Sequence, residues 1–170
     1  YAGIHSESTY FVPLSQTFVY WRLKVTNDSD RPRRLAVFSY CEFTNQWSTV
    51  QDQVNLQYSL FIVKGGLTDD GLLRIAIHDN LTPEPSAGRA DDIGMHAWLA
   101  LIGAPLAGYD TSREIFLGPY RGYHNPLAVE RGQCSNSDAY GDNACGSVQA
   151  ELVLQAGESR ELLVMLGIGD

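Results

Sequence analysis

The chain has 170 residues, of which 44% are hydrophobic and 11% aromatic, and this composition excludes a disordered, solvating segment. A chain of this length can bury roughly 70% of the surface that its unfolded form would expose, so one large domain is expected. The formal net charge of −8 and the pI near 4.8 argue against nucleic acid as a partner, because binding to phosphate backbones depends on clustered Lys and Arg.

The first third of the chain alternates apolar and polar residues with a period of two. This pattern predicts strands at residues 6–12 and 33–43, and a half-buried strand between them with one face formed by Val19, Trp21, Leu23 and Val25. Residues 27–30, Asn-Asp-Ser-Asp, have the composition of a turn. We therefore expect the strands on either side of this turn to form a hairpin.

Three further strands are predicted in the middle of the chain, at residues 56–63, 72–78 and 95–103. The pair Gly65 and Gly66 and the sequence Asp-Asp-Gly at 69–71 are interpreted as breaks between them. Helical periodicity is almost absent, so the middle of the chain is also expected to be β-structure.

The clearest local prediction is a closing hairpin, in which one strand carries Val148, Ala150, Leu152 and Leu154 on one face. Residues 156–158 form its turn, and the returning strand carries Leu162, Val164 and Leu166. Many short strands separated by Gly- and Pro-containing turns predict an all-β fold, a large antiparallel β-sandwich of one domain over residues 1–170. Two long polar loops, 79–93 and 132–146, interrupt it and are candidates for functional segments.

The chain contains no apolar run long enough to cross a membrane, and a membrane partner is not expected. It starts at Tyr1 without a signal-peptide pattern, so we expect an excised piece of a soluble protein. The odd number of cysteines, Cys41, Cys134 and Cys145, suits a reducing compartment, and the cytoplasm is predicted. Cys134 and Cys145 could close a loop if oxidised, although free thiols are the simpler interpretation.

Motifs for several kinds of chemistry are missing from the sequence. The cysteines form no CxxC pair and the histidines lack ligand spacing with one another, so no metal site is assigned. The sequence also lacks a GxSxG elbow, a P-loop and a GxGxxG motif. Carboxylates such as Glu7, Glu42 and Asp52 cannot be placed at the separation that glycoside chemistry requires, and no catalytic residue is assigned.

Residues 44–59, TNQWSTVQDQVNLQYS, differ from their surroundings because amides, hydroxyls and aromatic rings replace the alternating pattern. Asn and Gln side chains offer both a donor and an acceptor, and Trp47 and Tyr58 offer flat faces, which together suit sugar hydroxyls and ring C–H groups. A polar loop with one buried Trp would have the same composition. The residues alone leave both interpretations open.

Five blocks of the sequence resemble, in order, the N-terminal domain of cellobiose and cellodextrin phosphorylases of glycoside hydrolase family 94. They are VTNDSDRPRRLAVFSYCEF, NLQYS, GYDTSREIFLGPYRGYHNP, ERGQCSNSDAYGDNACGS and LQAGESRELLVMLGIG. The resemblance covers nearly the whole chain, and the third block is too specific for a generic sandwich. NLQYS and AYGDNACG are more similar to cellodextrin than to cellobiose phosphorylases, in which a sequence such as NFQRN is expected.

The resemblance implies that this chain is a supersandwich similar to galactose mutarotase. In the family a helical linker, an (α/α)6 catalytic barrel and a small C-terminal β domain follow it, and these three later parts are absent from this chain. It also implies a homodimer, with the sandwich near the barrel mouth. Gln57 and Tyr58 would bind substrate at the sugar cleft, although related enzymes have Arg at the position of Tyr58, which puts a direct Arg contact in doubt here. Residues 134–146 are a weaker candidate for contact across the dimer.

By this resemblance the parent enzyme is a phosphorylase of β-1,4-glucan oligomers, cellodextrin or cellobiose, that reversibly yields α-glucose 1-phosphate. Inorganic phosphate is a co-substrate and no cofactor is expected. Because inverting phosphorolysis needs a single carboxylic acid, and that acid would lie in the barrel, the isolated chain is predicted to be inactive. Two alternatives remain open at this point: a stand-alone carbohydrate-binding module, and a purely structural or dimerisation domain.

Overall fold

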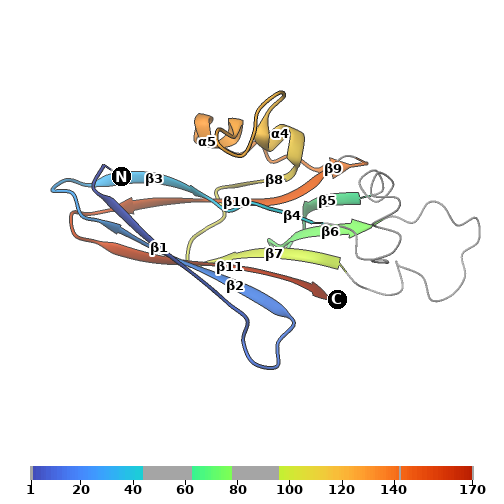
Figure 1. Ribbon diagram of the computed structural model, residues 1–170, viewed down its shortest axis with the longest axis horizontal. Coiled ribbons are helices and arrows are strands. Elements are labelled where there is room, and N and C mark those ends of the chain that lie inside the picture. Colours follow the sequence, from blue (N-terminus) through green and yellow to red (C-terminus); the bar gives the residue numbers. More distant parts are fainter. Residues whose placement is uncertain (1, 44–62, 78–95, 142, 170) are drawn as a thin grey trace, which may run out of the picture.

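The computed structural model describes residues 2–43, 63–77, 96–141 and 143–169, and in these ranges it is an antiparallel β-sandwich (Figure 1). One layer is a seven-stranded sheet in the order β1-β2-β11-β7-β6-β5-β9. Its strands are β1 (Ile4–Phe11), β2 (Phe18–Asn27), β11 (Ser159–Gly169), β7 (His96–Ile102), β6 (Leu73–Ile77), β5 (Val63–Leu67) and β9 (Ala139–Tyr140). The prediction of an all-β antiparallel sandwich is confirmed.

The second layer is a four-stranded sheet organised around one long strand. Strand β10 (Ala144–Leu154) pairs on one side with β3 (Arg33–Phe38) and β4 (Cys41–Glu42), and on the other side with β8 (Gly108–Ser112). Two short helices, α4 (Arg113–Leu117) and α5 (Leu127–Arg131), lie over the outer face of this sheet (Figure 1). Residues 144–150 of β10 are therefore buried on both faces.

The core lies between the two sheets and is formed by the faces that the sequence predicts. On β10, Leu154 is fully buried and Leu152 is 7% exposed, and both pack against Val25 of β2 and Leu162 of β11. Leu23 is half-buried and packs against the same cluster. The period-two pattern therefore predicts correctly which side chains face inward.

Both predicted hairpins are wrong, although their strands exist. Strand β2 pairs with β1 and β11, whereas β3 pairs with β10 in the other sheet. Strands β10 and β11 likewise belong to different sheets, so the closing turn is an arch between layers. The buried side chain of Asn27 holds the two crossings together, because its Nδ2 donates to the carbonyl oxygens of Arg31 at 2.8 Å and Leu154 at 3.2 Å. A period of two determines the face of a strand but not its partner.

Gly65 and Gly66 were predicted as a break, and this is also wrong, because both lie inside β5. A Cβ at Gly65 would be 2.7 Å from Ile75 Cδ1 and 2.8 Å from Thr111 Cβ, so the glycine lets β8 of the other sheet approach closely. The turn at 69–71 is confirmed, and Gly71 adopts a φ of 84° there. The predicted strand at 56–63 lies outside the described residues except for Val63, and the loop 79–93 lies wholly outside them.

Two other features bear on the predictions. None of the helices found in the described ranges is long and apolar enough to cross a membrane. Cys41, Cys134 and Cys145 are free thiols. Burial raises the pKa of the Cys41 and Cys134 thiols to about 12, so both stay protonated at neutral pH.

Candidate functional site

The sugar-binding residues predicted from the sequence, Gln57 and Tyr58, lie outside the described residues, as does Trp47. In the described part, the chain enters this segment from Glu42 and Phe43 and resumes at Val63 of β5. Glu42 is also the centre of a cluster of hydrogen-bonded side chains at the surface of the four-stranded sheet. We therefore build the site from this residue.

Three side chains donate hydrogen bonds to one carboxylate oxygen of Glu42. Its Oε1 accepts from the Tyr40 hydroxyl at 2.7 Å, from Arg113 Nε at 2.8 Å and from the Tyr123 hydroxyl at 2.8 Å. Arg113 Nη2 also donates to the Tyr123 hydroxyl at 3.3 Å, and its guanidinium lies 5.7 Å from the centre of the Tyr123 ring. We refer to Tyr40, Glu42, Arg113 and Tyr123 as the Glu42 cluster.

The fold brings these residues together from three segments. Glu42 lies on β4, Arg113 is the first residue of α4, and Tyr123 lies between α4 and α5. The Tyr40 ring stacks on Phe116 of α4 with centroids 4.8 Å apart, which ties the helix to the sheet. Gly118 has a φ of 86°, and a Cβ there would lie 2.9 Å from Leu127 Cβ, so the tight turn after α4 requires a glycine.

The cluster fixes the protonation states of its members. Partial burial by itself would raise the pKa of Glu42, but the hydrogen bonds from Tyr40, Arg113 and Tyr123 outweigh burial and lower it. The pKa of Arg113 is raised by its hydrogen bonds to Tyr123 and Glu42, and burial raises the pKa of Tyr40. At neutral pH Glu42 is therefore an anion, Arg113 a cation and Tyr40 a neutral phenol.

This arrangement is suited to binding and not to proton transfer. A carboxyl group whose pKa is lowered carries no proton to donate at neutral pH, so Glu42 can only accept hydrogen bonds. Between α4 and α5, Tyr123 is 63% exposed and Tyr120 is fully exposed, so this connection carries two accessible aromatic rings. Exposed rings beside a fixed ion pair can contact polyhydroxylated ligands through ring C–H groups and hydroxyls.

A second polar network is buried and centres on Asp110 of β8. The carboxylate is fully buried and accepts from the backbone N–H of Ser135 at 3.1 Å, from the N–H of Ser137 at 3.0 Å and from the Ser137 hydroxyl at 2.7 Å. These bonds attach the loop after α5 to β8. A buried carboxyl group is tolerated here because several donors face it.

Two neighbouring side chains extend this network along the same loop. Thr111 donates to the Ser137 carbonyl at 3.0 Å and accepts from the Ala139 N–H at 2.8 Å. Gln149 of β10 accepts from the Cys134 N–H at 2.8 Å and donates to the Gly132 carbonyl at 3.1 Å. The two most distinctive blocks of the sequence, 108–126 and 130–147, therefore form one physical unit.

The model of a known family, "Glycosyl hydrolase 94, supersandwich domain", matches residues 1–170. The chain belongs to glycosyl hydrolase family 94. Among curated proteins it is 38% identical over 170 residues to an N,N'-diacetylchitobiose phosphorylase of Vibrio proteolyticus, covering 99% of this chain and 20% of that protein. It is 35% identical to the protein of that name in Vibrio furnissii, again over 99% of this chain and 20% of the relative.

More distant relatives of this family 94 domain include a solabiose phosphorylase of Paenibacillus borealis, 27% identical over 100% of this chain and 20% of that protein. The chain thus spans about a fifth of the length of the curated relatives that it matches. Among solved structures, a polysaccharide lyase covers 99% of this chain and 20% of its own, with a TM-score of 0.51 and 14% identity. This last likeness concerns the fold alone.

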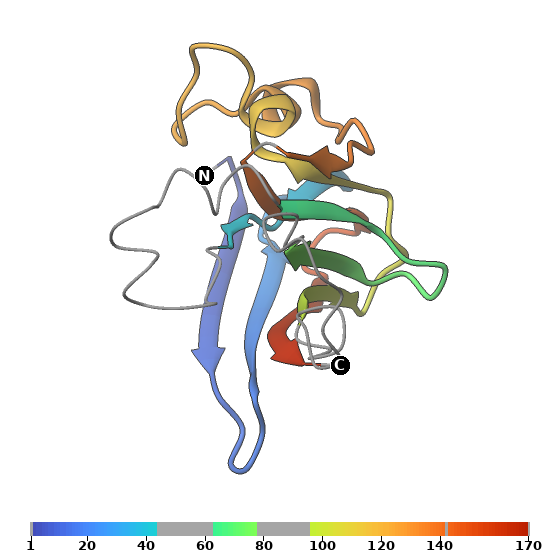
Figure 2. The same ribbon diagram turned by 90° about the vertical axis from the view of Figure 1, so that its right-hand side faces the viewer.

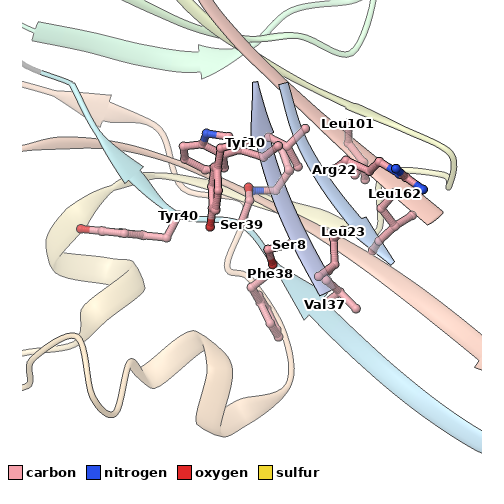
Figure 3. A pocket seen from close by; sticks show the side chains of 14 residues that line it. Ser8, Tyr10, Arg22, Leu23, Val37, Phe38, Ser39, Tyr40, Leu101 and Leu162 are labelled. Atoms are coloured by element: carbon pink, nitrogen blue, oxygen red, sulfur yellow. The ribbon is translucent and has the colours of Figure 1, made fainter. Parts of the chain in front are cut away.

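A cavity of about 240 Å³ lies between the two sheets of the family 94 domain, on the side where β1 and β3 lie (Figure 3). Leu23 of β2 and Val37 of β3 point toward each other inside it, whereas Tyr40 points away toward the helices (Figure 3). Its polar groups include Ser39, whose hydroxyl accepts from the Val148 N–H at 3.3 Å. The cavity is separate from the Glu42 cluster apart from Tyr40, which contributes to both.

Sequence reasoning named Glu42 among the carboxylates but did not pair it with Arg113 or Tyr123, which lie 71 and 81 residues away. The signal that was available is the third block, in which both partners occur. Glu7 is exposed on β1, and Asp52 lies outside the described residues. Within the described ranges, no group of three His, Cys, Asp or Glu side chains is arranged to hold a metal ion.

Proposed function

We propose that this chain is the N-terminal supersandwich domain of an inverting phosphorylase, which cleaves a β-linked oligosaccharide with inorganic phosphate and releases an α-sugar 1-phosphate. The observation that carries the proposal is the match of the family 94 domain model to all 170 residues, together with 38% and 35% identity to two phosphorylases. Because the chain spans about a fifth of those relatives, the catalytic apparatus is assigned to the rest of the protein.

In this proposal the domain binds and orients sugar and does not transfer the proton. Inverting phosphorolysis needs one carboxylic acid, which protonates the leaving oxygen while phosphate attacks the opposite face of the sugar. Glu42 is unsuited to that role because its pKa is lowered, and Asp110 is buried under its own hydrogen-bond donors. Inorganic phosphate is a co-substrate, and the reaction requires no cofactor.

The substrate is proposed to be a β-linked disaccharide or a longer oligomer. The sequence blocks favour cellodextrin or cellobiose, whereas the names of the relatives favour N,N'-diacetylchitobiose. A cellobionic acid phosphorylase of Neurospora crassa is 26% identical, so the acceptor varies within the family. Gln57 and Tyr58 are proposed to contact the sugar.

The partners of the domain are proposed to be the catalytic barrel of the same polypeptide and a second copy in a cytoplasmic homodimer. Residues Ser135, Asn136 and Tyr140 are exposed on the loop that Asp110 holds in place. A loop that is rigidly anchored yet exposed suits such a contact, since little conformational entropy is lost on binding.

A purely structural domain is the second candidate, and the packing of two indoles against aromatic neighbours favours it. Trp21 packs edge-on against Tyr10 with centroids 5.9 Å apart, and Trp98 packs against Phe18 at the same distance. If the domain only braces the enzyme, its tryptophan fluorescence should not respond to oligosaccharide.

The proposal is tested with the full-length protein, inorganic phosphate and a panel of cellobiose, cellotetraose and N,N'-diacetylchitobiose. We expect phosphate-dependent cleavage of at least one substrate, with the α anomer of the sugar 1-phosphate as the first product by proton NMR. The chain 1–170 alone should release none above a protein-free control. Hydrolysis without phosphate, or a β-linked first product, would contradict the proposal.

A further inference from the structure

The two sheets of the sandwich do not match in width on one side. Strand β1 is the end strand of the seven-stranded sheet and β3 is the end strand of the four-stranded sheet. Leu23 of β2 and Val37 of β3 meet across the sandwich, so β3 lies opposite β2 (Figure 3). The start of β1 is covered, because Arg33 Nη1 of β3 donates to the Ala2 carbonyl oxygen at 2.6 Å and Ile4 packs against the same core cluster as Val37. From Ser8 onward, β1 extends beyond the described part of the facing layer.

The inward face of β1 has the exposure that this mismatch implies. Ser8 and Tyr10 pair with Leu23 and Trp21 on the core side of β2, yet Ser8 is exposed and Tyr10 is 67% exposed. Both line the cavity between the sheets. An inward-facing aromatic side chain that is two-thirds exposed indicates a missing neighbour, because sandwich interiors are normally filled from both sheets.

The general spacings of strands and sheets predict where an added β-strand would lie. Strands in a sheet lie about 4.8 Å apart and facing sheets about 10 Å apart, so a strand added beside β3 would lie over the inward face of β1. Figure 2 shows the long β1–β2 ribbon from the side, with β1 at its outer margin. Backbone groups along the free margin of an end strand are a ready template for such pairing.

We propose that a further β-strand of the same polypeptide, outside residues 1–170, pairs with the edge of β3 and covers Ser8 and Tyr10 of β1. This rests on the proposed function, in which the chain is one domain of a longer phosphorylase. The chain spans a fifth of the relatives it matches, so much polypeptide is available to supply the strand. Every second residue of that strand is apolar, since it fills a cavity lined by Trp21, Leu23 and Val37.

The size of the gap favours the same polypeptide over a second copy. A surface one strand wide and six residues long measures about 20 Å by 5 Å. A stable interface between two proteins buries about 800 Å² on each partner, several times this footprint. A tethered strand needs less surface, because its effective concentration reaches the millimolar range.

The test compares two single-cysteine additions in the full-length protein, Ser8→Cys and Thr9→Cys, by the rate of alkylation with a small maleimide. Both native side chains are exposed, but Ser8 faces the cavity and Thr9 faces the opposite side of the sheet. We expect the thiol at position 8 to react at least about tenfold more slowly than the thiol at position 9. In the chain 1–170 the two rates should be similar, and the protein without additions gives the background from Cys41, Cys134 and Cys145.

Equal rates in the full-length protein would overturn the proposal. Protection that also occurs in the chain 1–170 would assign the cover to this chain itself, and protection lost on dilution would assign it to a second copy; either would overturn it. A second test requires no variant. We expect the backbone amides of residues 33–38 to exchange hydrogen more slowly in the full-length protein than in the chain 1–170. None of these readouts depends on activity, so a failed phosphorolysis assay would not by itself contradict this inference.

Discussion

The four-stranded sheet and the β1 end of the seven-stranded sheet differ in how far their faces are buried. Strand β10 is covered by the other sheet on one face and by α4 and α5 on the other, and its residues 144–150 are all buried. Strand β1 is exposed along residues 5–11, including the side that faces inward. The first region is complete within this chain, and we infer that the second is completed from outside it.

The largest effect is expected at Phe116, which is 1% exposed and joins the helices to the sheet through Tyr40. Replacing Phe116 by Ala should cost about 3 to 5 kcal/mol of unfolding free energy, because it leaves a cavity between α4 and the four-stranded sheet. Ile115→Ala, at the 45% exposed neighbour, is the matched control and should change stability by less than about 1 kcal/mol. Urea denaturation measures both, and equal losses would mean that Phe116 does not anchor α4 to the sheet.

The next effect concerns the core between the sheets. Leu152→Ala should cost about 2 to 5 kcal/mol, whereas Val153→Ala, at a residue 59% exposed on the same strand, should be nearly neutral. Leu23→Ala should lie at the low end of that range because Leu23 is half-buried at the cavity. If Leu23→Ala costs more stability in the full-length protein than in the chain 1–170, the cavity is filled in the full-length protein.

A smaller loss is predicted for the buried network. Asp110→Asn keeps Oδ1, which accepts from Ser137, but it places an NH2 group at the position of Oδ2, opposite the N–H of Ser135, at a cost of about 1 to 3 kcal/mol. Asp138→Asn, at an exposed residue that accepts from the Tyr109 hydroxyl, should cost less than about 0.5 kcal/mol. Faster hydrogen exchange of residues 132–140 in the first variant alone is the expected result. Unchanged exchange would show that Asp110 does not anchor the loop.

The smallest effect is a pH dependence at Glu42. Its pKa is lower in the folded chain than the ordinary value of 4.5, so its contribution to stability is present above about pH 4.5 and is lost as the pH falls through the lowered folded pKa. Because Glu42 is partly exposed, the contribution should stay below about 1 kcal/mol. The stability difference between the native chain and Glu42→Gln should shrink below pH 4.5. Glu114→Gln, at an exposed residue of α4, is the control.

The faces of the strands could be predicted from the sequence, whereas their partners could not. Alternation around Leu23 and Leu152 reports which side chains avoid water, and this is a local property. The crossings between sheets depend on Asn27, whose side chain reaches residues as far away as Leu154. The sequence predicts a break at Gly65 because a glycine is typical of turns. Its actual role is to leave room for the Thr111 side chain of β8, and that contact exists only in the folded chain.

The candidate site was also only partly predictable, because its contacts join distant parts of the sequence. The block that holds Arg113 and Tyr123 could be singled out from its residue pattern, but the convergence of these two side chains on Glu42 joins three segments of the chain. The sugar-facing prediction for Gln57 and Tyr58 stays a prediction, because both lie outside the described residues. Family membership was predictable because it depends on residue patterns along the chain and not on their contacts.

The central proposal is that this domain binds sugar for a reaction whose proton donor lies elsewhere, and Gln57→Ala in the full-length protein tests it most directly. Losing a hydrogen bond to a sugar hydroxyl costs about 1 to 3 kcal/mol, or roughly 5-fold to 150-fold in kcat/KM. The loss should be similar on the natural disaccharide and on an aryl β-glycoside in the same donor position, because a binding contact is indifferent to the leaving group. A variant within twofold of the parent on both substrates, with unchanged stability, would contradict the sugar contact. A loss of 10²-fold or more that the aryl glycoside largely rescues would instead assign proton transfer to this domain.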